Sequence, residues 1–209
     1  QLSIEIIGQN DRPTANDDTA EVNENKLISK DTKSGVILSN DHDPDGEDLL
    51  INSFRTGPLN ETGIEGSFAT PLEGEFGTLQ LNADGSYEYR ADLDNVDSLD
   101  EGDRVNETFT YSLTDGKEND QGQLTIAIYG RNDAPTLKTP TSGLIEEVEG
   151  EMTTTSQNLT GTLDGEDADD DAALSYSFAA GAFTVGLNSR TGDYGTLSVD
   201  SNTGEYIYT

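Results

Sequence analysis

An internal repeat constrains this sequence more than any other feature. The opening QLSIEIIGQNDRPT (1–14) returns as QLTIAIYGRNDAPT (123–136), an offset of 122 residues (123 − 1). Two further stretches recur in the same order: DPDGEDLLINSF (43–54) matches DADDDAALSYSF (167–178), and FGTLQLNADGSYEY (76–89) matches YGTLSVDSNTGEYIY (194–208). Three collinear matches at a nearly constant offset predict tandem copies of one structural unit of about 122 residues.

The same matches set the predicted domain boundaries. Residues 1–9 are interpreted as the last strand of a preceding repeat, and residues 10–131 as one complete repeat. Residues 132–209 are interpreted as a second, C-terminally incomplete repeat. Because both ends fall inside a repeat, the sequence is expected to be a window on a longer array.

Short runs of alternating apolar and polar residues, separated by turn signals, predict that the repeat is all-β. The run TFTYSL (108–113) alternates with a period of two, and Asp84-Gly85 supplies the positive φ that a tight hairpin requires. The spacing of the strands is typical of an immunoglobulin-like β-sandwich. The predicted strands lie near residues 19–23, 34–38, 49–54, 76–81, 86–90, 107–113 and 121–129, with a long loop at 55–75.

Composition excludes several classes of partner and site. Asp and Glu outnumber Lys and Arg 42 to 11, which gives a formal net charge of −31. Nucleic acids and anionic membranes demand basic patches, so neither is expected as a partner. The absence of cysteine excludes disulfides and zinc–thiolate sites. No apolar run approaches membrane-spanning length, so direct membrane insertion is not expected. The acidic surplus favours a surface that is either loaded with metal ions or halophile-like.

One acidic stretch has the spacing of a calcium loop. Asp41, Asp43 and Asp45, followed by Gly46, match a D-x-D-x-D-G opening, in which alternate residues project oxygen atoms to one side. An EF-hand would need a glutamate at loop position twelve, where this sequence has Asn52, together with flanking helices. A generic calcium loop is therefore predicted, and the alternative is a solvated acidic turn. The second copy repeats the spacing with Asp167, Asp169 and Asp171.

The junctions between the repeats carry a second signal. Asn10-Asp11 and Asn132-Asp133 each follow a terminal strand, and a proline closes each junction and stiffens it. Together with the acidic loop, GTLQLNADGSYEY (77–89) and FTYSLTDG (109–116), these junctions make the sequence resemble the bacterial cadherin-like repeats of large surface adhesins. Such repeats are of the VCBS and tandem-95 types, in RTX-like proteins that are exported by type I secretion. The resemblance covers nearly the whole chain.

The resemblance implies tandem Greek-key β-sandwiches whose junctions bind Ca²⁺. Carried over by position, the implied ligands of the first repeat are Asn10, Asp11, Glu24, Asp43 and Asp45, and those of the second are Asn132, Asp133, Asp167, Asp169 and either Glu146 or Glu147. It also implies a secreted protein at the bacterial outer cell surface, without catalysis. Its partners would be calcium and the neighbouring repeats, with surface glycans or proteins bound by distal domains. The implied role is a calcium-rigidified extender that serves adhesion and biofilm attachment.

Two alternative functions remain open on the sequence. A glycosidase would need two carboxyl groups across a cleft, usually with aromatic platforms. The sequence has no Trp, nucleophile elbow, phosphate loop or zinc motif. The loop 55–75 could instead make the chain a glycan- or peptide-binding module of the same adhesin. Asp115-Gly116 is interpreted as a plain hairpin turn, and the alternative is that Asp115 contributes a calcium ligand. His42, the only histidine, is not a candidate catalytic base.

Overall fold

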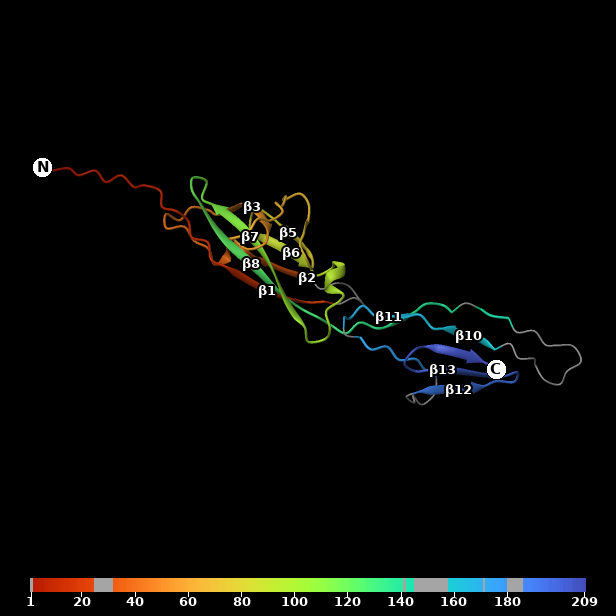
Figure 1. The fold of residues 1–209 in the computed structure, drawn as a ribbon. Coiled ribbons are helices and arrows are strands. Elements are labelled where there is room, and N and C mark those ends of the chain that lie inside the picture. The colour runs from red at the N-terminus through yellow and green to blue at the C-terminus, as the bar shows by residue number, and fades with distance from the viewer. Residues whose placement is uncertain (1, 25–31, 141, 145–157, 171, 180–185) are drawn as a thin grey trace, which may run out of the picture. The chain divides into compact units, whose positions relative to one another are not determined.

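The structure is a computed structural model that describes residues 2–24, 32–140, 142–144, 158–170, 172–179 and 186–209. The chain divides into two compact units, Gln1–Asp133 and Ala134–Thr209 (Figure 1). Each unit is described by itself.

One sheet of the first unit contains four strands in the order β1-β8-β7-β3. Their bounds are β1 Asp18–Asn23, β3 Leu50–Thr56, β7 Arg104–Thr114 and β8 Asn119–Tyr129. β7 and β8 form a long antiparallel hairpin. β1 instead runs parallel to β8, with Asp18 opposite Leu124 and Asn23 opposite Tyr129. The chain therefore leaves β1 at the end of the sheet where β8 finishes.

A second sheet has the order β2-β6-β5-β4. Its strands are β2 Thr32–Val36, β4 Leu72–Glu73, β5 Thr78–Leu81 and β6 Ser86–Arg90, and two short 3-10 helices lie at Ile37–Ser39 and Asp94–Val96. The turn between β5 and β6 is closed by a hydrogen bond of 3.0 Å from Gly85 N–H to Asn82 O, with Gly85 at a φ of 78°. This is the hairpin that the Asp-Gly pair predicts.

The two sheets share one hydrophobic core. Phe54, Phe109 and Leu113 come from the first sheet and Leu79 and Tyr89 from the second, and all five are almost fully buried. The rings of Tyr89 and Phe109 meet edge to face across the core, with their centroids 6.0 Å apart. The first unit is therefore a β-sandwich, and the all-β prediction is confirmed.

The second unit contains a four-stranded sheet in the order β10-β14-β13-β12 and a short β9–β11 ladder. The bounds are β9 Thr136–Leu137, β10 Leu159–Thr162, β11 Gly165–Glu166, β12 Leu187–Thr191, β13 Thr196–Asp200 and β14 Glu205–Tyr208. Gly161 lies opposite Tyr206 here, as Gly35 lies opposite Tyr87 in the first unit. In both pairs the tyrosine ring covers the glycine so closely that no Cβ fits without a shift.

Each predicted strand of the first unit is observed, and both of its ends lie within three residues of the predicted ends. The main difference lies in the predicted loop 55–75, which contains the short strand β4 and two isolated bridges, Arg55 to Glu65 and Ser67 to Thr70. Gly66 N–H donates to Phe54 O at 2.8 Å, so this loop pairs with the outer edge of β3 and covers it. Across the described residues, no helix is long and apolar enough to cross a membrane.

Candidate functional site

The N-terminal segment of the first unit is tied to the start of β8 and to the loop that precedes β3. Nη2 of Arg12 lies 2.7 Å from Oδ1 of Asp120, at the start of β8. The backbones of Thr14 and His42 exchange two hydrogen bonds, of 2.9 and 3.2 Å. These two anchors bring the junction residues before Arg12 next to the acidic loop.

Three carboxylates of that loop converge. One oxygen atom from each of Asp43, Asp45 and Glu47 lies within 4.8 Å of the other two, and we call these residues the Asp43–Glu47 cluster. Oδ1 of Asp43 accepts hydrogen bonds from the backbone N–H groups of Asp45 (2.8 Å) and Gly46 (3.2 Å), and Gly46 has a φ of 82° that suits glycine. In the part of the chain that the structure describes, this is the only group of three or more potential metal ligands at such separations.

Two oxygen atoms of the cluster are buried without a hydrogen-bond partner among the described residues: Oδ2 of Asp43 and Oε2 of Glu47. A buried carboxylate oxygen that accepts no hydrogen bond lowers stability, and carboxylates this close repel one another. A Ca²⁺ ion removes both penalties, because it takes six to eight oxygen ligands and prefers carboxylates. The cluster could therefore hold a metal ion, and its carboxylate oxygens are the donors that Ca²⁺ prefers.

The junction residues Asn10 and Asp11 contact this cluster and its surroundings. The backbone N–H of Asp11 donates to Oδ2 of Asp45 at 2.7 Å. Nδ2 of Asn10 donates to Oδ2 of Asp115 at 2.8 Å, and Oδ1 of Asn10 accepts from Nζ of Lys117 at 2.6 Å. The structure thus brings Asn10, Asp11, Asp43 and Asp45 to one place, at the end of the sandwich where the β7–β8 hairpin turns.

Three residues at this place are not among the ligands that the sequence predicts: Glu47, Asp115 and Lys117. Oδ1 of Asp115 accepts the backbone N–H groups of Lys117 (2.6 Å) and Glu118 (2.7 Å), as a turn residue does. Hydrogen bonding, first from Asn10, lowers the pKa of Asp115 to about 2, so its carboxylate is charged. Nζ of Lys117 lies 2.7 Å from Oε1 of Glu47, and that hydrogen bond raises the pKa of Lys117. The prediction of a hairpin turn at Asp115 is thus correct, although the turn also meets the acidic loop.

Asp41, which the sequence predicts as a ligand, lies in a different group. Its Oδ1 accepts the backbone N–H of Asn16 at 2.7 Å, and its Oδ2 lies 3.4 Å from the hydroxyl of Tyr111. The same hydroxyl lies 2.8 Å from Asn16 O and 3.1 Å from Oδ2 of Asp18. Burial raises the pKa of Asp41, and it raises the pKa of Asp18 to about 6. The structure does not bring Asp41 into the Asp43–Glu47 cluster, because these contacts hold its side chain at the start of β1.

Glu24 also lies apart from the cluster, whereas the sequence grouped it with Asp43 and Asp45. Its backbone N–H donates to Tyr129 O at 2.8 Å, so it lies at the C-terminal end of β8. The 11 residues of β8 extend over about 35 Å, and the cluster lies near the other end of that strand. The parallel pairing of β1 with β8 is the cause of this separation. At the same end as Glu24, Asn132 and Asp133 follow β8, and Glu24 and Asp133 are 1% and 4% exposed.

In the second unit the acidic loop has a similar local geometry. Oδ1 of Asp167 accepts the backbone N–H of Asp169 at 3.2 Å, as Oδ1 of Asp43 accepts that of Asp45. Lys138 binds nearby carboxylates, with Nζ 3.0 Å from Oδ2 of Asp164 and also paired with Glu166. The predicted ligands Glu146, Glu147 and Asp171 lie outside the described residues.

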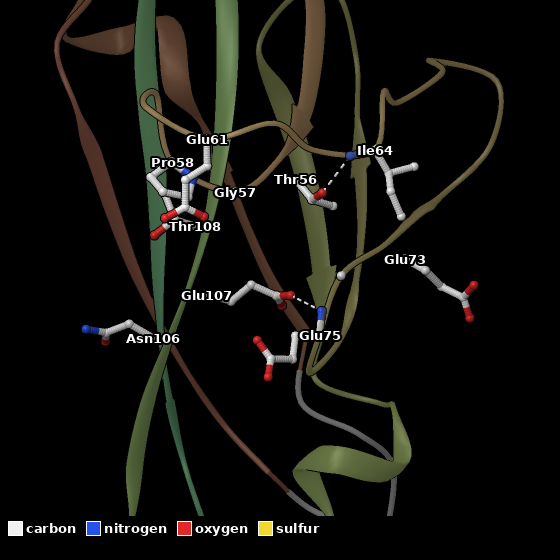
Figure 2. Close-up of a pocket in the computed structure, with 11 residues that line it drawn as sticks. Thr56, Gly57, Pro58, Glu61, Ile64, Glu73, Glu75, Asn106, Glu107 and Thr108 are labelled. Carbon is white, nitrogen blue, oxygen red and sulfur yellow. Dashed lines mark hydrogen bonds between the residues drawn. The ribbon is translucent and has the colours of Figure 1, made fainter.

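A separate pocket of about 390 Å³ opens beneath the loop that follows β3 (Figure 2). Glu61, Glu73 and Glu75 line it, and Figure 2 shows the Glu107 carboxylate directed at the backbone nitrogen of Glu75. Glu107 is 7% exposed and also accepts a hydrogen bond from the hydroxyl of Tyr89. Burial raises the pKa of Glu107. The lining residues include no aromatic or basic side chain, so the pocket offers neither a sugar platform nor an anion site.

Comparison with known proteins identifies a family that matches this chain. Residues 10–130 match the bacterial cadherin-like domain family. No curated protein matches the sequence. Similar solved structures include mouse clustered protocadherin PcdhgC3 EC1-3, with 15% identity, a TM-score of 0.37 and coverage of 95% of this chain and 56% of that chain. Drosophila N-cadherin EC1-4 has 13% identity and a TM-score of 0.37, with coverage of 92% of this chain and 39% of that chain.

An endo-fucoidan hydrolase from glycoside hydrolase family 107 also matches, with 13% identity, a TM-score of 0.36 and coverage of 94% of this chain. This chain spans only 24% of that hydrolase. The family match extends over residues 10–130, which is more than half of the 209 residues, and the chain therefore belongs to the bacterial cadherin-like domain family.

Proposed function

We propose that this chain is a calcium-stabilised extender segment of a bacterial cell-surface adhesin, with no catalytic role of its own. Cadherin-like domains are extracellular modules that generally take part in adhesion and typically bind calcium. The extender role goes further: the segment would carry load between the cell and distal binding domains, as part of an array of similar units.

One observation carries the proposal: the Asp43–Glu47 cluster combines three converging carboxylates with two buried oxygen atoms that accept no hydrogen bond from the described residues. In a purely solvated acidic turn, these carboxylate oxygens would be exposed and would accept hydrogen bonds from water. The surplus of 42 acidic over 11 basic residues adds to the case, because self-repulsion destabilises the compact state until cations neutralise it.

The sequence predicts a second set of ligands, Asn132, Asp133, Asp167, Asp169 and either Glu146 or Glu147. We include this set in the proposal because Asp133 is a buried carboxylate and because Asp167 has the same local turn as Asp43. Glu24 joins the proposal as a ligand at the Tyr129 end of the first unit, apart from the Asp43–Glu47 cluster.

The experiment is a calcium titration of the full 209-residue chain by calorimetry, with thermal unfolding in calcium and in chelator. Extracellular calcium modules bind at about 10⁻⁴ to 10⁻³ M, so at ten to a hundred times the dissociation constant one site adds about 1.4 to 2.7 kcal/mol. The melting temperature should rise clearly in calcium. Single-molecule stretching should show a higher unfolding force in calcium than in chelator. Identical curves in calcium and chelator, at physiological salt, would exclude structural calcium.

A ligand-binding module remains the second candidate because of the pocket beneath the loop that follows β3. Its lining carries several carboxyl groups and no aromatic side chain, which favours a cationic ligand over a glycan. A glycan and peptide binding screen separates the two functions, since the extender requires no ligand at this pocket.

A further inference from the structure

We propose that Lys117 is a tethered cation that competes with calcium for the Asp43–Glu47 cluster, an inference that rests on the proposed function. Lys117 comes from the β7–β8 hairpin, whereas the cluster lies in the loop before β3, so the contact depends on the folded sandwich. The lysine would hold the apo site together and lower the calcium affinity of the site.

The contacts of the ammonium group carry this inference. Nζ of Lys117 lies 2.7 Å from Oε1 of Glu47 and 2.6 Å from Oδ1 of Asn10. Both oxygens belong to residues that would otherwise face the ion, one in the cluster and one in the junction. The second oxygen of the Glu47 carboxylate is buried and unpartnered within the described residues. Lys117 therefore provides a hydrogen bond to only one of the two Glu47 carboxylate oxygens.

The chemistry of the two cations makes them competitors. An ammonium group only donates hydrogen bonds, so Lys117 cannot act as a calcium ligand. A divalent ion bound by Glu47 would also repel a lysine charge a few ångströms away. The chain then has two alternatives: Lys117 stays on Glu47 and Asn10, or the ion takes these oxygens and the lysine moves to solvent. The side chain of Lys117 is 58% exposed, which leaves it a path outward.

Two consequences follow. Without calcium, Lys117 offsets part of the repulsion between the carboxylates, so its removal should destabilise the apo protein. In the protein without Lys117, a calcium ion does not have to displace an ammonium group. The removal of Lys117 should therefore tighten calcium binding. From Coulomb's law at the effective dielectric of a partly exposed site, the gain in calcium affinity should be about tenfold.

The test compares the wild-type chain with Lys117→Met, which keeps the apolar stem and removes the charge, and with Lys117→Arg, which keeps the charge. Arg90→Gln is the matched control, because it removes one surface cation from β6, where Arg90 pairs with the exposed Glu88. Each full-length protein is titrated with CaCl₂ by calorimetry and melted in chelator. We expect about tenfold tighter calcium binding and a lower melting temperature in chelator for Lys117→Met alone.

The outcomes separate this inference from the function on which it rests. If Lys117→Met binds calcium no more tightly than wild type and Arg90→Gln, Lys117 is not a competitor, although calcium binding itself stands. Weaker binding by Lys117→Met would instead make the lysine a positioning residue for Asn10 and Glu47 and overturn the competition. If wild type and all variants fail to bind calcium, the proposed function fails, and this inference fails with it.

Discussion

Glu107 on β7 accepts a hydrogen bond from the hydroxyl of Tyr89 on β6, and this contact joins the two sheets of the first unit through their core. The other carboxylate oxygen of Glu107 accepts the backbone N–H groups of Glu75 and Phe76, at the turn between β4 and β5. One buried carboxylate thus connects β6 and the β4–β5 turn of the second sheet to the first sheet. Burial raises the pKa of Glu107 and of its partner Tyr89.

Replacing Glu107 tests how much this contact stabilises the sandwich. Glu107→Ala leaves the Tyr89 hydroxyl and two backbone N–H groups without their acceptor and also creates a cavity. We therefore expect a loss of about 2 to 4 kcal/mol in the free energy of unfolding. Glu107→Gln keeps the shape and one acceptor and should lose less than half as much. Urea unfolding at pH 7 measures both, and equal losses would contradict the role of the acceptor.

The pH dependence of the same pair follows from the raised pKa of Glu107. Because the pKa of Glu107 in the folded state is above the ordinary value of 4.5, protonation of Glu107 favours the folded state over the unfolded state. The contribution of Glu107 is then fully present below the unfolded pKa and is lost as pH rises through the folded pKa. Wild type should therefore gain stability over Glu107→Gln as the pH is lowered from 7 to 4. If the difference in unfolding free energy between wild type and Glu107→Gln is the same at pH 7 and pH 4, the pKa of Glu107 is not raised in the folded state.

Asp18 gives a second pH-dependent prediction. Burial raises its pKa from 3.8 to about 6, so its favourable contribution is present below pH 3.8 and is lost as pH rises through about 6. Asp18→Asn should therefore stabilise the protein at pH 7.5 in chelator, by about 1 kcal/mol after allowance for solvent screening of this half-buried group. The advantage should disappear towards pH 4. Glu101→Gln, at an exposed turn, is the control for net charge and should show no such trend.

The sequence predicts strands better than it predicts sites, and the reason is the range of the interactions involved. Alternation along TFTYSL (108–113) and the Asp84-Gly85 turn are local signals, so the strands around them lie where the sequence puts them. The strand β4 has only two residues, Leu72 and Glu73, which is too short for any periodicity. The position of β4 depends on its pairing with β5, and no local sequence pattern predicts it.

The ligand positions show the same division. Asp43 and Asp45 share a loop, and their spacing alone predicts that they lie together. The resemblance groups Glu24 with these two residues, but the parallel pairing of β1 with β8 puts Glu24 at the other end of β8. No local signal distinguishes parallel from antiparallel pairing of these two strands. The sequence does not predict the contact between Glu47 and Lys117, because it joins segments 70 residues apart.

The proposed calcium loop itself can be tested by exchanging aspartate for asparagine, which keeps the shape of the side chain and removes its charge. Asp43→Asn with Asp45→Asn should lower the calcium stoichiometry in calorimetry, because the cluster loses two of its three carboxylates. The asparagine oxygen at position 43 can still accept the backbone N–H groups of the loop, so the turn should persist. Asp92→Asn with Asp94→Asn removes the same charge elsewhere and should leave the stoichiometry unchanged. Equal effects of the two pairs would indicate diffuse counterion binding instead of a defined site.

The last prediction concerns Gly122 on β8, which lies opposite Tyr111 on β7. A Cβ at position 122 would come within 2.5 Å of the Tyr111 hydroxyl oxygen. That hydroxyl binds the backbone of Asn16 at 2.8 Å and so fixes the segment that leads from the acidic loop contacts into β1. Gly122→Ala should therefore displace the tyrosine and cost about 1 to 3 kcal/mol in unfolding free energy, as overpacking of a core does.

The same displacement should also reach the proposed calcium site, because the segment before Asn16 carries Asn10 and Asp11 to the Asp43–Glu47 cluster. We expect Gly122→Ala to weaken calcium binding in calorimetry as well as to lower the melting temperature. Gly8→Ala is the control, since nothing lies within 4 Å of a Cβ at that position. Tyr111→Phe separates the two effects: it keeps the ring and removes only the hydroxyl. If Tyr111→Phe weakens calcium binding while Gly122→Ala does not, the hydroxyl acts on the site without the ring displacement that we infer.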